Sequence, residues 1–364
     1  MINILQYSDI YKQQWQQLIE RSATATWFQT PEAYAFYASV PDEMEPFAIG
    51  VSEDNKLQGL IVGYITREKN PLKQFLTRRA IIIGGPLLDE HISDEALSAL
   101  LSAIAQCKVE GLKFKGMGNS EADTNASTPY TLHPTPIFIE SRNFHDYSKW
   151  KTIFENNGFA YQSHLNFHVD TTSLDIVEQN LGKSRKRDIK TSLRDGASVV
   201  EQPTIEQVAA YYKLLKHLYT TKIKTPLFSQ HFFEQLYHHP NGRFILVERE
   251  GEIIGGTVCV ELPNRCLYEW FVCGRDGEWK SIFPSSLATY AGIRYAAEHG
   301  CLRFDMMGAG KPDEAYGVRD FKARFGGEQV EHGRFLCVRK PLLYWIGKMG
   351  VKWLKRWGLA LARI

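Results

Sequence analysis

Several common catalytic signatures are missing from this sequence. The six cysteines form no CxxC pair, and neither an HExxH metal-binding pattern nor a GxSxG serine-nucleophile pattern occurs. These absences disfavour metal catalysis and serine-nucleophile catalysis, and no metal site is predicted. A chain of 364 residues can build its cores without disulfides. The cysteines are therefore expected to be free thiols that pack as small hydrophobic side chains in a reducing compartment.

Strong net charge and long apolar runs are also missing. The formal net charge is +2, which is too small for a dedicated nucleic-acid-binding protein. The N-terminal residues 1–17 lack a basic stretch followed by an apolar one, and no run of 18 apolar residues occurs. The sequence therefore predicts a cytoplasmic protein with no secretory leader and no membrane-spanning helix.

Two parts of the chain show the same order of expected elements: a strand hairpin, a third strand and then a helix. In both hairpins a glycine, Gly59 or Gly255, follows soon after the turn, where a β-bulge or a close backbone approach is expected. The expected elements are strands at 47–51, 57–65 and 80–83 with a helix at 93–106, and strands at 244–248, 253–260, 266–273 and 302–306 with a helix at 284–299.

This order predicts a mixed α/β (α+β) protein built from two similar units. Two unrelated α/β domains would fit the same periodicity. We expect the first unit to span residues 1–160, the second 161–340, and a separate C-terminal helix 341–364.

The segment 302–328 carries the most unusual pattern. An expected strand ends in a glycine-containing loop at Gly308 and Gly310, and a short helix around 317–325 then carries Lys322 and Arg324. Ligands of α/β enzymes bind at such strand ends. Helical residues two apart point in different directions, so one of the two cations can face a cleft while the other stays solvated. The alternative is that both are ordinary surface charges.

Two further segments have a functional and a purely structural interpretation. The helix start at Pro284, Ser285 and Ser286 exposes backbone N–H groups that attract anions, but it also fits a capped structural helix. The basic run 183–194, which includes Arg187, fits a phosphate or RNA contact or a solvated helix face.

The C-terminal segment 341–364 is basic and amphipathic and contains no acidic residue. This composition is typical of a helix that lies on an anionic membrane surface. A terminal helix docked on the second unit is the alternative. The apolar stripe consists of Leu342, Ile346, Met349, Trp353 and Trp357.

The stretch from Tyr268 to Gly327 resembles the Fem-type (FemAB-like) peptidoglycan-bridge aminoacyltransferases within the N-acetyltransferase (GNAT) superfamily. The resemblance extends over nearly the whole chain, although each motif is short. The matching pieces are the strand with Tyr268, the helix start 284–287, the strand 303–305, Phe321-Lys322, 325–327, the basic segment 184–200 and the N-terminal motif 28–32.

The resemblance implies two tandem GNAT-like units with mixed sheets, the first on the acceptor side and the second with the active site. It implies transfer of an acyl group from aminoacyl-tRNA or acyl-CoA, used as a co-substrate, to an amine, with no tightly bound cofactor. By position, Lys322 would place positive charge against the developing oxyanion and Phe321 would position the reacting groups. Tyr268, Ser285, Ser286, Asp305 and Arg187 would contact substrate, and Asp305 and Asp320 are candidates for the base by location.

One departure affects the acceptor. The lysine that the family carries in the first helix after the N-terminal motif is replaced by the run Tyr34-Ala35-Phe36-Tyr37. We expect an aminoacyl or acyl transferase that acts on a peptidoglycan or surface-polysaccharide precursor, with a peripheral contact to the inner membrane face through 341–364. The alternatives are an acyl-CoA-dependent N-acyltransferase acting on a sugar or lipid amine, and a non-catalytic binding module with the same fold.

Overall fold

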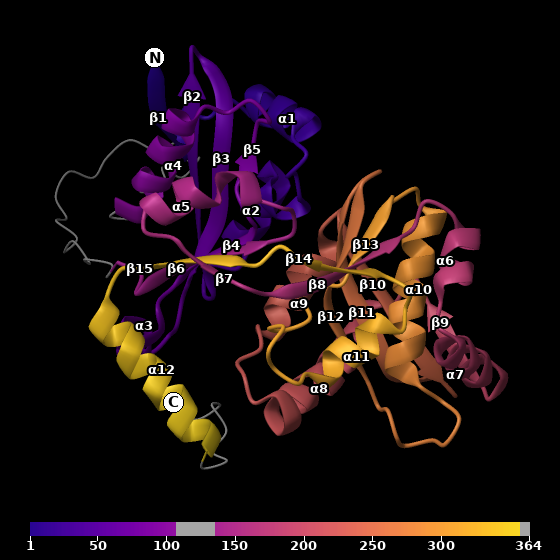
Figure 1. Cartoon of the computed structure of the whole chain (residues 1–364). Coiled ribbons are helices and arrows are strands. Elements are labelled where there is room, and N and C mark those ends of the chain that lie inside the picture. The colour runs from indigo at the N-terminus through magenta and orange to yellow at the C-terminus, as the bar shows by residue number, and fades with distance from the viewer. Residues whose placement is uncertain (107–134, 357–364) are drawn as a thin grey trace, which may run out of the picture.

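The computed structural model describes the backbone of residues 1–106 and 135–356, and the side chains of these residues up to 350. Two mixed β-sheets lie side by side, and helices pack around each of them (Figure 1). The first sheet is assembled largely from the N-terminal half of the chain and the second from the C-terminal half. The predicted α/β architecture with mixed sheets is confirmed.

The first sheet has the strand order β1-β2-β3-β4-β6-β15-β7, and β5 pairs with β3. Its strands are β1 (Ile2–Gln6), β2 (Met44–Glu53), β3 (Lys56–Thr66), β4 (Ala80–Gly84), β5 (Leu87–Leu88), β6 (Phe138–Asn143), β7 (Ala160–Gln162) and β15 (Arg334–Val338). Its helices are α1 (Lys12–Arg21), α2 (Pro31–Ser39), α3 (Pro71–Thr77), α4 (Asp94–Gln106) and α5 (Lys151–Asn156), with short 3₁₀ turns η1 (Tyr7–Asp9), η2 (Trp27–Gln29) and η3 (Ser148–Trp150).

The second sheet has the strand order β14-β8-β13-β12-β11-β10-β9. Its strands are β8 (Leu165–Asp170), β9 (Ala197–Val200), β10 (Gly242–Arg249), β11 (Glu252–Leu262), β12 (Cys266–Gly274), β13 (Arg303–Asp305) and β14 (Glu328–Glu331). Its helices are α6 (Leu174–Asn180), α7 (Lys183–Arg194), α8 (Ile205–Leu218), the π-helical turn η4 (Tyr219–Ile223), α9 (Gln230–His238), α10 (Pro284–Glu298) and α11 (Gly317–Ala323).

The two units repeat one pattern of strand pairing. In the first, β2, β3 and β4 pair antiparallel and β6 then joins β4 in parallel after α4. In the second, β10, β11 and β12 pair antiparallel and β13 joins β12 in parallel after α10. The predicted duplication is therefore confirmed at the level of strand topology.

The hairpin bulges fall where the glycines predicted them. The register of β2 and β3 skips Gln58, the residue just before Gly59, and that of β10 and β11 skips Ile254, just before Gly255. At Gly255 a Cβ would lie 2.9 Å from the Pro284 side chain and 3.0 Å from the carbonyl of Cys273. A side chain at this position would therefore collide with α10 and β12, which is why the strand needs glycine there.

The two units exchange strands where they meet. Strand β15 lies late in the sequence but pairs with β6 and β7 of the first sheet, while β8 pairs with β13 and β14 of the second. The predicted segment 161–340 thus supplies β15 and most of β7 to the sheet of the first unit, and β7, β8, β14 and β15 cross the junction together (Figure 1).

The last described helix is α12 (Pro341–Arg356), which begins where the C-terminal helix was predicted. It contacts α3, and Tyr344 packs edge-to-face on Phe138 of β6, so it docks on the first unit and not on the second. The alternative that this helix docks on the second unit is therefore wrong. Residues 357–364, including Trp357, lie outside the described part of the chain, as does the side chain of Trp353. Among the described residues, no helix is both long and apolar enough to cross a membrane.

Candidate active site at the split between two parallel strands

Strands β12 and β13 separate at one defined point. They pair in parallel over three residues each, and the last pair is Tyr268 with Asp305. β12 then continues to Gly274, whereas the chain leaves β13 through Met307 and Gly308, whose φ angles are 53° and 112°. We call this point the β12–β13 split. Within the described residues, no strand pairs with β12 on that side beyond Tyr268, so strand pairing does not use the backbone groups of β12 there.

Lys322 projects into this split from α11. Its side chain is buried, and Nζ donates hydrogen bonds to the carbonyl oxygens of Met306 and Gly308, the second at 2.9 Å. A lysine ammonium has three donors, so one remains for a ligand. Burial lowers the Lys322 pKa, while the nearby carboxylates of Glu269 and Asp305 raise it. Arg324, two residues on, is exposed, in agreement with the helical spacing.

Glu269 carries the carboxylate whose charge raises the Lys322 pKa most. Sequence analysis did not identify this residue. It is the first residue of β12 past the split and is buried. One oxygen accepts hydrogen bonds from the hydroxyls of Thr289 (2.9 Å) and Thr257 (3.3 Å), while the other has no hydrogen-bond partner among the described residues. Burial raises the Glu269 pKa, and the charge of Lys322 opposes that shift. An acidic residue inside the apolar run 267–273 was the available signal.

Asp305 occupies the opposite side of the split and is fully buried. Its carboxylate accepts hydrogen bonds from the Asn166 amide and the Met307 N–H, both at 2.7 Å, and lies 3.1 Å from Nε2 of His168. Against the cost of burial, His168, Arg303 and Asn166 lower the Asp305 pKa to about 2. A carboxylate held this firmly is a weak base, so these contacts favour a positioning part for Asp305.

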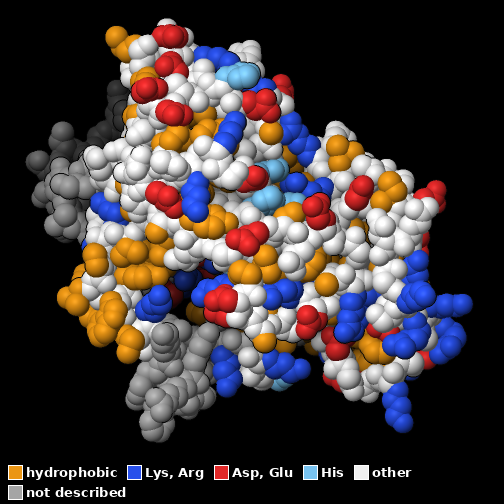
Figure 2. Space-filling model, in the orientation of Figure 1, with side chains coloured by type: hydrophobic (Ala, Val, Ile, Leu, Met, Phe, Trp, Pro, Cys, Tyr) orange, Lys and Arg blue, Asp and Glu red, His pale blue; other side chains and the backbone are white. Residues whose placement is uncertain are grey.

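Three histidines gather beside Asp305 where the two units meet. His145 follows β6, His168 lies on β8 and His332 precedes β15, and the rings of His168 and His332 are 5.3 Å apart. Burial, followed by the charge of Arg303, lowers the His145 pKa to about 3, and burial also lowers that of His332. Figure 2 shows histidine side chains at the surface near this junction. Sequence spacing could not bring these residues together, because they meet only through the exchange of strands.

Phe321 and the basic helix α7 are joined by a buried arginine. The guanidinium of Arg185 lies over the ring of Phe321 (4.6 Å), which places one face of Phe321 against protein. The same guanidinium donates to Asp188 (2.9 Å) and to the hydroxyl of Ser286 at the start of α10 (3.0 Å). Arg185 therefore connects α7, α10 and α11, and it is not available to an external phosphate. Arg187 points outward, with 72% of its side chain exposed.

Two backbone N–H groups at the start of α10 are already bound to protein side chains. The N–H of Ser285 donates to the carboxylate of Asp276 (3.2 Å), and the N–H of Phe283 donates to the hydroxyl of Ser192 (2.9 Å). Ser286 is buried and bound to Arg185. A carboxylate at a helix N-terminus satisfies the dipole and repels a second anion. These contacts support the interpretation of this segment as the start of a capped structural helix.

Tyr268 lies in the interior of the protein. It is fully buried, and its ring packs on Phe28 of η2 and Phe144, with centroid separations of 5.5 and 5.6 Å. Its hydroxyl has no hydrogen-bond partner among the described residues. Phe28 belongs to the N-terminal motif, so this aromatic contact joins the two units. Asp320, the other candidate base, is exposed on α11.

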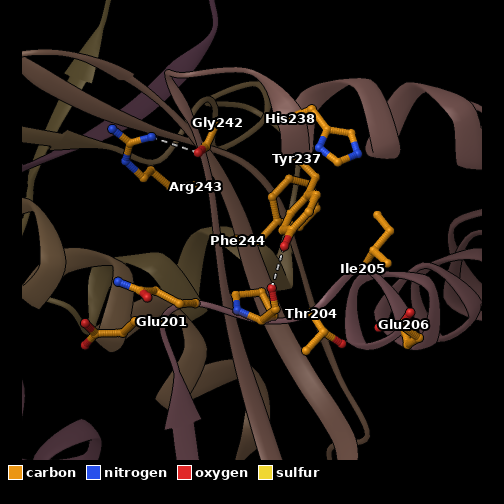
Figure 3. A pocket seen from close by; sticks show the side chains of 11 residues that line it. Glu201, Thr204, Ile205, Glu206, Tyr237, His238, Gly242, Arg243 and Phe244 are labelled. Carbon is orange, nitrogen blue, oxygen red and sulfur yellow. Dashed lines mark hydrogen bonds between the residues drawn. The ribbon is translucent and has the colours of Figure 1, made fainter.

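A depression of about 860 Å³ lies away from all of these residues (Figure 3). It is formed by the start of α8, the end of α9 and the start of β10, and β11 separates it from the split. In Figure 3 the hydroxyl of Tyr237 points to the backbone of Pro203, at 2.8 Å. None of the predicted site residues lines it.

Residues 183–322 match the protein family described as "Acetyltransferase (GNAT) domain". This part of the chain is similar to a GNAT acetyltransferase domain. The matched segment runs from the first residue of α7 to Lys322 and includes the β12–β13 split. The prediction of a transferase is therefore confirmed. The sequence matches no curated protein.

Solved structures place the whole chain within a tandem GNAT fold. It is similar to the "Crystal structure of FemX", with a TM-score of 0.67 and 14% identity, over 94% of this chain and 99% of that one. It is also similar to "The structure of L-PGS from Bacillus licheniformis" (TM-score 0.53, 14% identity, 92% and 96% covered). A third is the "Tandem GNAT protein from the clavulanic acid biosynthesis pathway" (TM-score 0.52, 10% identity, 92% and 98% covered). The fold expected from the Fem-type resemblance is confirmed.

Proposed function

We propose that this GNAT protein transfers an aminoacyl or acyl group from an activated donor to an amine of a cell-envelope precursor, with the chemistry at the β12–β13 split. The observation that carries the proposal is the burial of the Lys322 ammonium beside Gly308, where two carbonyls hold it and one donor remains. Burying an ammonium group costs free energy. A site that must stabilise negative charge during a reaction gives a reason to keep such a group.

The reaction can be followed atom by atom. The nitrogen of the neutral acceptor amine attacks the donor carbonyl carbon, and the carbonyl oxygen becomes an oxyanion that receives the free N–H of Lys322. The unpartnered oxygen of Glu269 takes the proton released from the amine. The bond between the carbonyl carbon and the donor oxygen or sulfur then breaks, and the proton passes to that leaving group. An amide and the free donor alcohol or thiol result.

The contacts at α10 favour aminoacyl-tRNA over coenzyme A as the donor. A coenzyme A pyrophosphate bound at this helix start would face the carboxylate of Asp276, which already accepts the Ser285 N–H. The exposed cations of α7, among them Lys183, Lys186 and Arg187, offer a nearby surface for a polynucleotide phosphate chain. A CoA-dependent reaction on a sugar or lipid amine is the second candidate, supported by the similarity to a tandem GNAT protein.

The envelope acceptor is supported by the fold relatives, two of which are FemX and an L-PGS. We propose that the acceptor binds where the two units meet, beside Asp305 and the three histidines. A non-catalytic binding module remains the third candidate, and it would need neither the buried Lys322 nor the unpartnered Glu269 oxygen.

Product analysis tests the proposal directly. The full chain is incubated with charged tRNA or acyl-CoA and a set of candidate amines, including amino sugars and peptidoglycan precursors, and products are identified by intact mass. We expect amide formation from charged tRNA that depends on Lys322. Failure of every donor, together with binding of a precursor, would favour the non-catalytic module instead.

A further inference from the structure

Two helices from distant parts of the chain place apolar side chains in solvent next to each other. α3 and α12 are in contact, and Nζ of Lys340, just before α12, lies 5.6 Å from the centre of the Phe75 ring. The exposed fractions reach 68% for Leu72, 71% for Leu342 and 61% for Trp345. Figure 2 shows hydrophobic side chains gathered over this region. We call the set the apolar patch: Leu72, Phe75, Leu76, Leu342, Trp345, Ile346 and Met349.

The segments that carry this patch are basic. Neither 69–79 nor 339–350 contains an aspartate or a glutamate. Lys348 is exposed on α12, with Nζ 5.8 Å from the Tyr344 ring centre, and Lys340 covers Phe75. Apolar and aromatic side chains with lysines around them are the pattern of a protein surface that lies on anionic lipid.

A basic cavity adjoins the same helix. It has a volume of about 230 Å³ and lies between α3 and the end of α8 with η4. Lys73 of α3 lines it together with Lys216 and Lys224, against one acidic residue, Glu68. α3 therefore presents apolar side chains to solvent and also contributes a lysine to a cavity with an excess of positive charge. A lipid phosphate is the type of anion that such a cavity attracts.

We propose that the apolar patch and the adjoining basic cavity dock this protein on the surface of an anionic lipid bilayer. The aliphatic and aromatic side chains of α3 and α12 enter the headgroup region, and Lys73, Lys216 and Lys224 face lipid phosphates. Two copies of this chain joined through the patch would bring like charges together, whereas an anionic bilayer is complementary to it. The proposal does not depend on the acyl-transfer reaction.

Vesicle sedimentation tests the docking. The full chain is mixed with vesicles of phosphatidylcholine alone, of phosphatidylcholine with phosphatidylglycerol, and of phosphatidylcholine with phosphatidylserine. We expect strong binding to both anionic mixtures and weak binding to phosphatidylcholine. Lys73→Ala and Lys216→Ala should each reduce the partition coefficient about fivefold, and Trp345→Glu should reduce it by more. Leu193→Glu changes an exposed apolar side chain on α7, with an exposed fraction of 48% against 61% for Trp345, and this control should bind as the parent does.

Several results would overturn the proposal. These are equal binding to neutral and anionic vesicles, binding to phosphatidylglycerol but not phosphatidylserine, or an equal loss in Leu193→Glu. A dimer detected by light scattering that Trp345→Glu abolishes would show that the patch joins two copies instead. An unchanged melting temperature confirms that each variant is folded. Acyl transfer to a soluble amine, measured without vesicles, keeps this test separate from that of the reaction.

Discussion

Nζ of Lys322 lies 2.9 Å from the carbonyl oxygen of Gly308, the residue at which the chain turns away from β13. This contact fixes the ammonium at the place where β12 and β13 part, with Glu269 and Asp305 on either side of it. A cation held by backbone groups needs no rearrangement when negative charge develops on a substrate, which is the condition for efficient electrostatic stabilisation.

Replacing Lys322 by Met should remove this stabilisation while keeping the volume of the side chain. We expect the rate of amide formation to fall by about 10²–10³, because one oxyanion donor contributes about 2.7–4 kcal/mol to lowering the barrier. The measurement is the initial rate under donor saturation, with circular dichroism to verify folding. Arg324→Ala removes an exposed cation two residues away and should leave the rate unchanged. A Lys322→Met protein with the parent rate would exclude the proposed role.

Glu269→Gln should abolish proton acceptance and also change how stability depends on pH. The folded-state pKa of Glu269 is raised by burial, so ionisation disfavours the folded state as pH rises from the unfolded pKa through the folded one. Glutamine carries no such charge. We therefore expect the free energy of unfolding of Glu269→Gln, relative to the parent, to be more favourable at about pH 8 than at about pH 5.

Urea unfolding at both pH values measures this difference, and Glu328→Gln, an exposed position on β14, is the control for loss of a surface charge. If the free energy of unfolding of Glu269→Gln, relative to the parent, were less favourable at high pH than at low pH, Glu269 would be stabilised as an anion by Lys322. Full activity in Glu269→Gln would move the search for the base to His168, whose Nε2 faces Asp305.

Arg185 and Arg187 are two residues apart on α7 but should respond very differently to alanine. Arg185→Ala removes the buried partner of Asp188, which keeps only its ion pair with the exposed Arg187, and it also removes the contacts to Ser286 and Phe321. We therefore expect a loss of about 3 kcal/mol in the free energy of unfolding. Arg187→Ala should cost less than about 1 kcal/mol, because its ion pair with Asp188 is made by a side chain that is 72% exposed. Chemical denaturation measures both, and equal losses would contradict the structural assignment.

Local patterns predicted the parts of the fold that local physics decides. The apolar alternation gave both hairpins, and Gly59 and Gly255 marked their bulges because a side chain there meets a neighbouring element. The two-residue spacing of Lys322 and Arg324 correctly separated a buried from an exposed cation. Pro284 and Gly300, whose φ is 76°, bracket α10 for the same kind of local reason.

Contacts between distant segments could not be predicted in this way. The basic run on α7 reads as a uniform charged face, yet Arg185 is buried because Ser286, about a hundred residues later, accepts its hydrogen bond. β15 joins the first sheet, and His145, His168 and His332 meet, because strands from the two units cross at the junction. Pairing between strands so far apart leaves no spacing pattern along the chain.

Coenzyme A should not stabilise the protein, whereas aminoacyl-tRNA should. The N–H groups of Ser285 and Phe283 at the start of α10 already donate to Asp276 and Ser192, and the Asp276 carboxylate repels a further anion. Tight binding of a donor at a hundredfold excess over its Kd should raise the free energy of unfolding by about 2.7 kcal/mol, which thermal denaturation detects. Asp276→Asn keeps a hydrogen-bond acceptor but removes the charge, so a response to coenzyme A confined to this variant would identify repulsion as the cause. Stabilisation of the parent protein by coenzyme A alone would reverse the proposed order of donors.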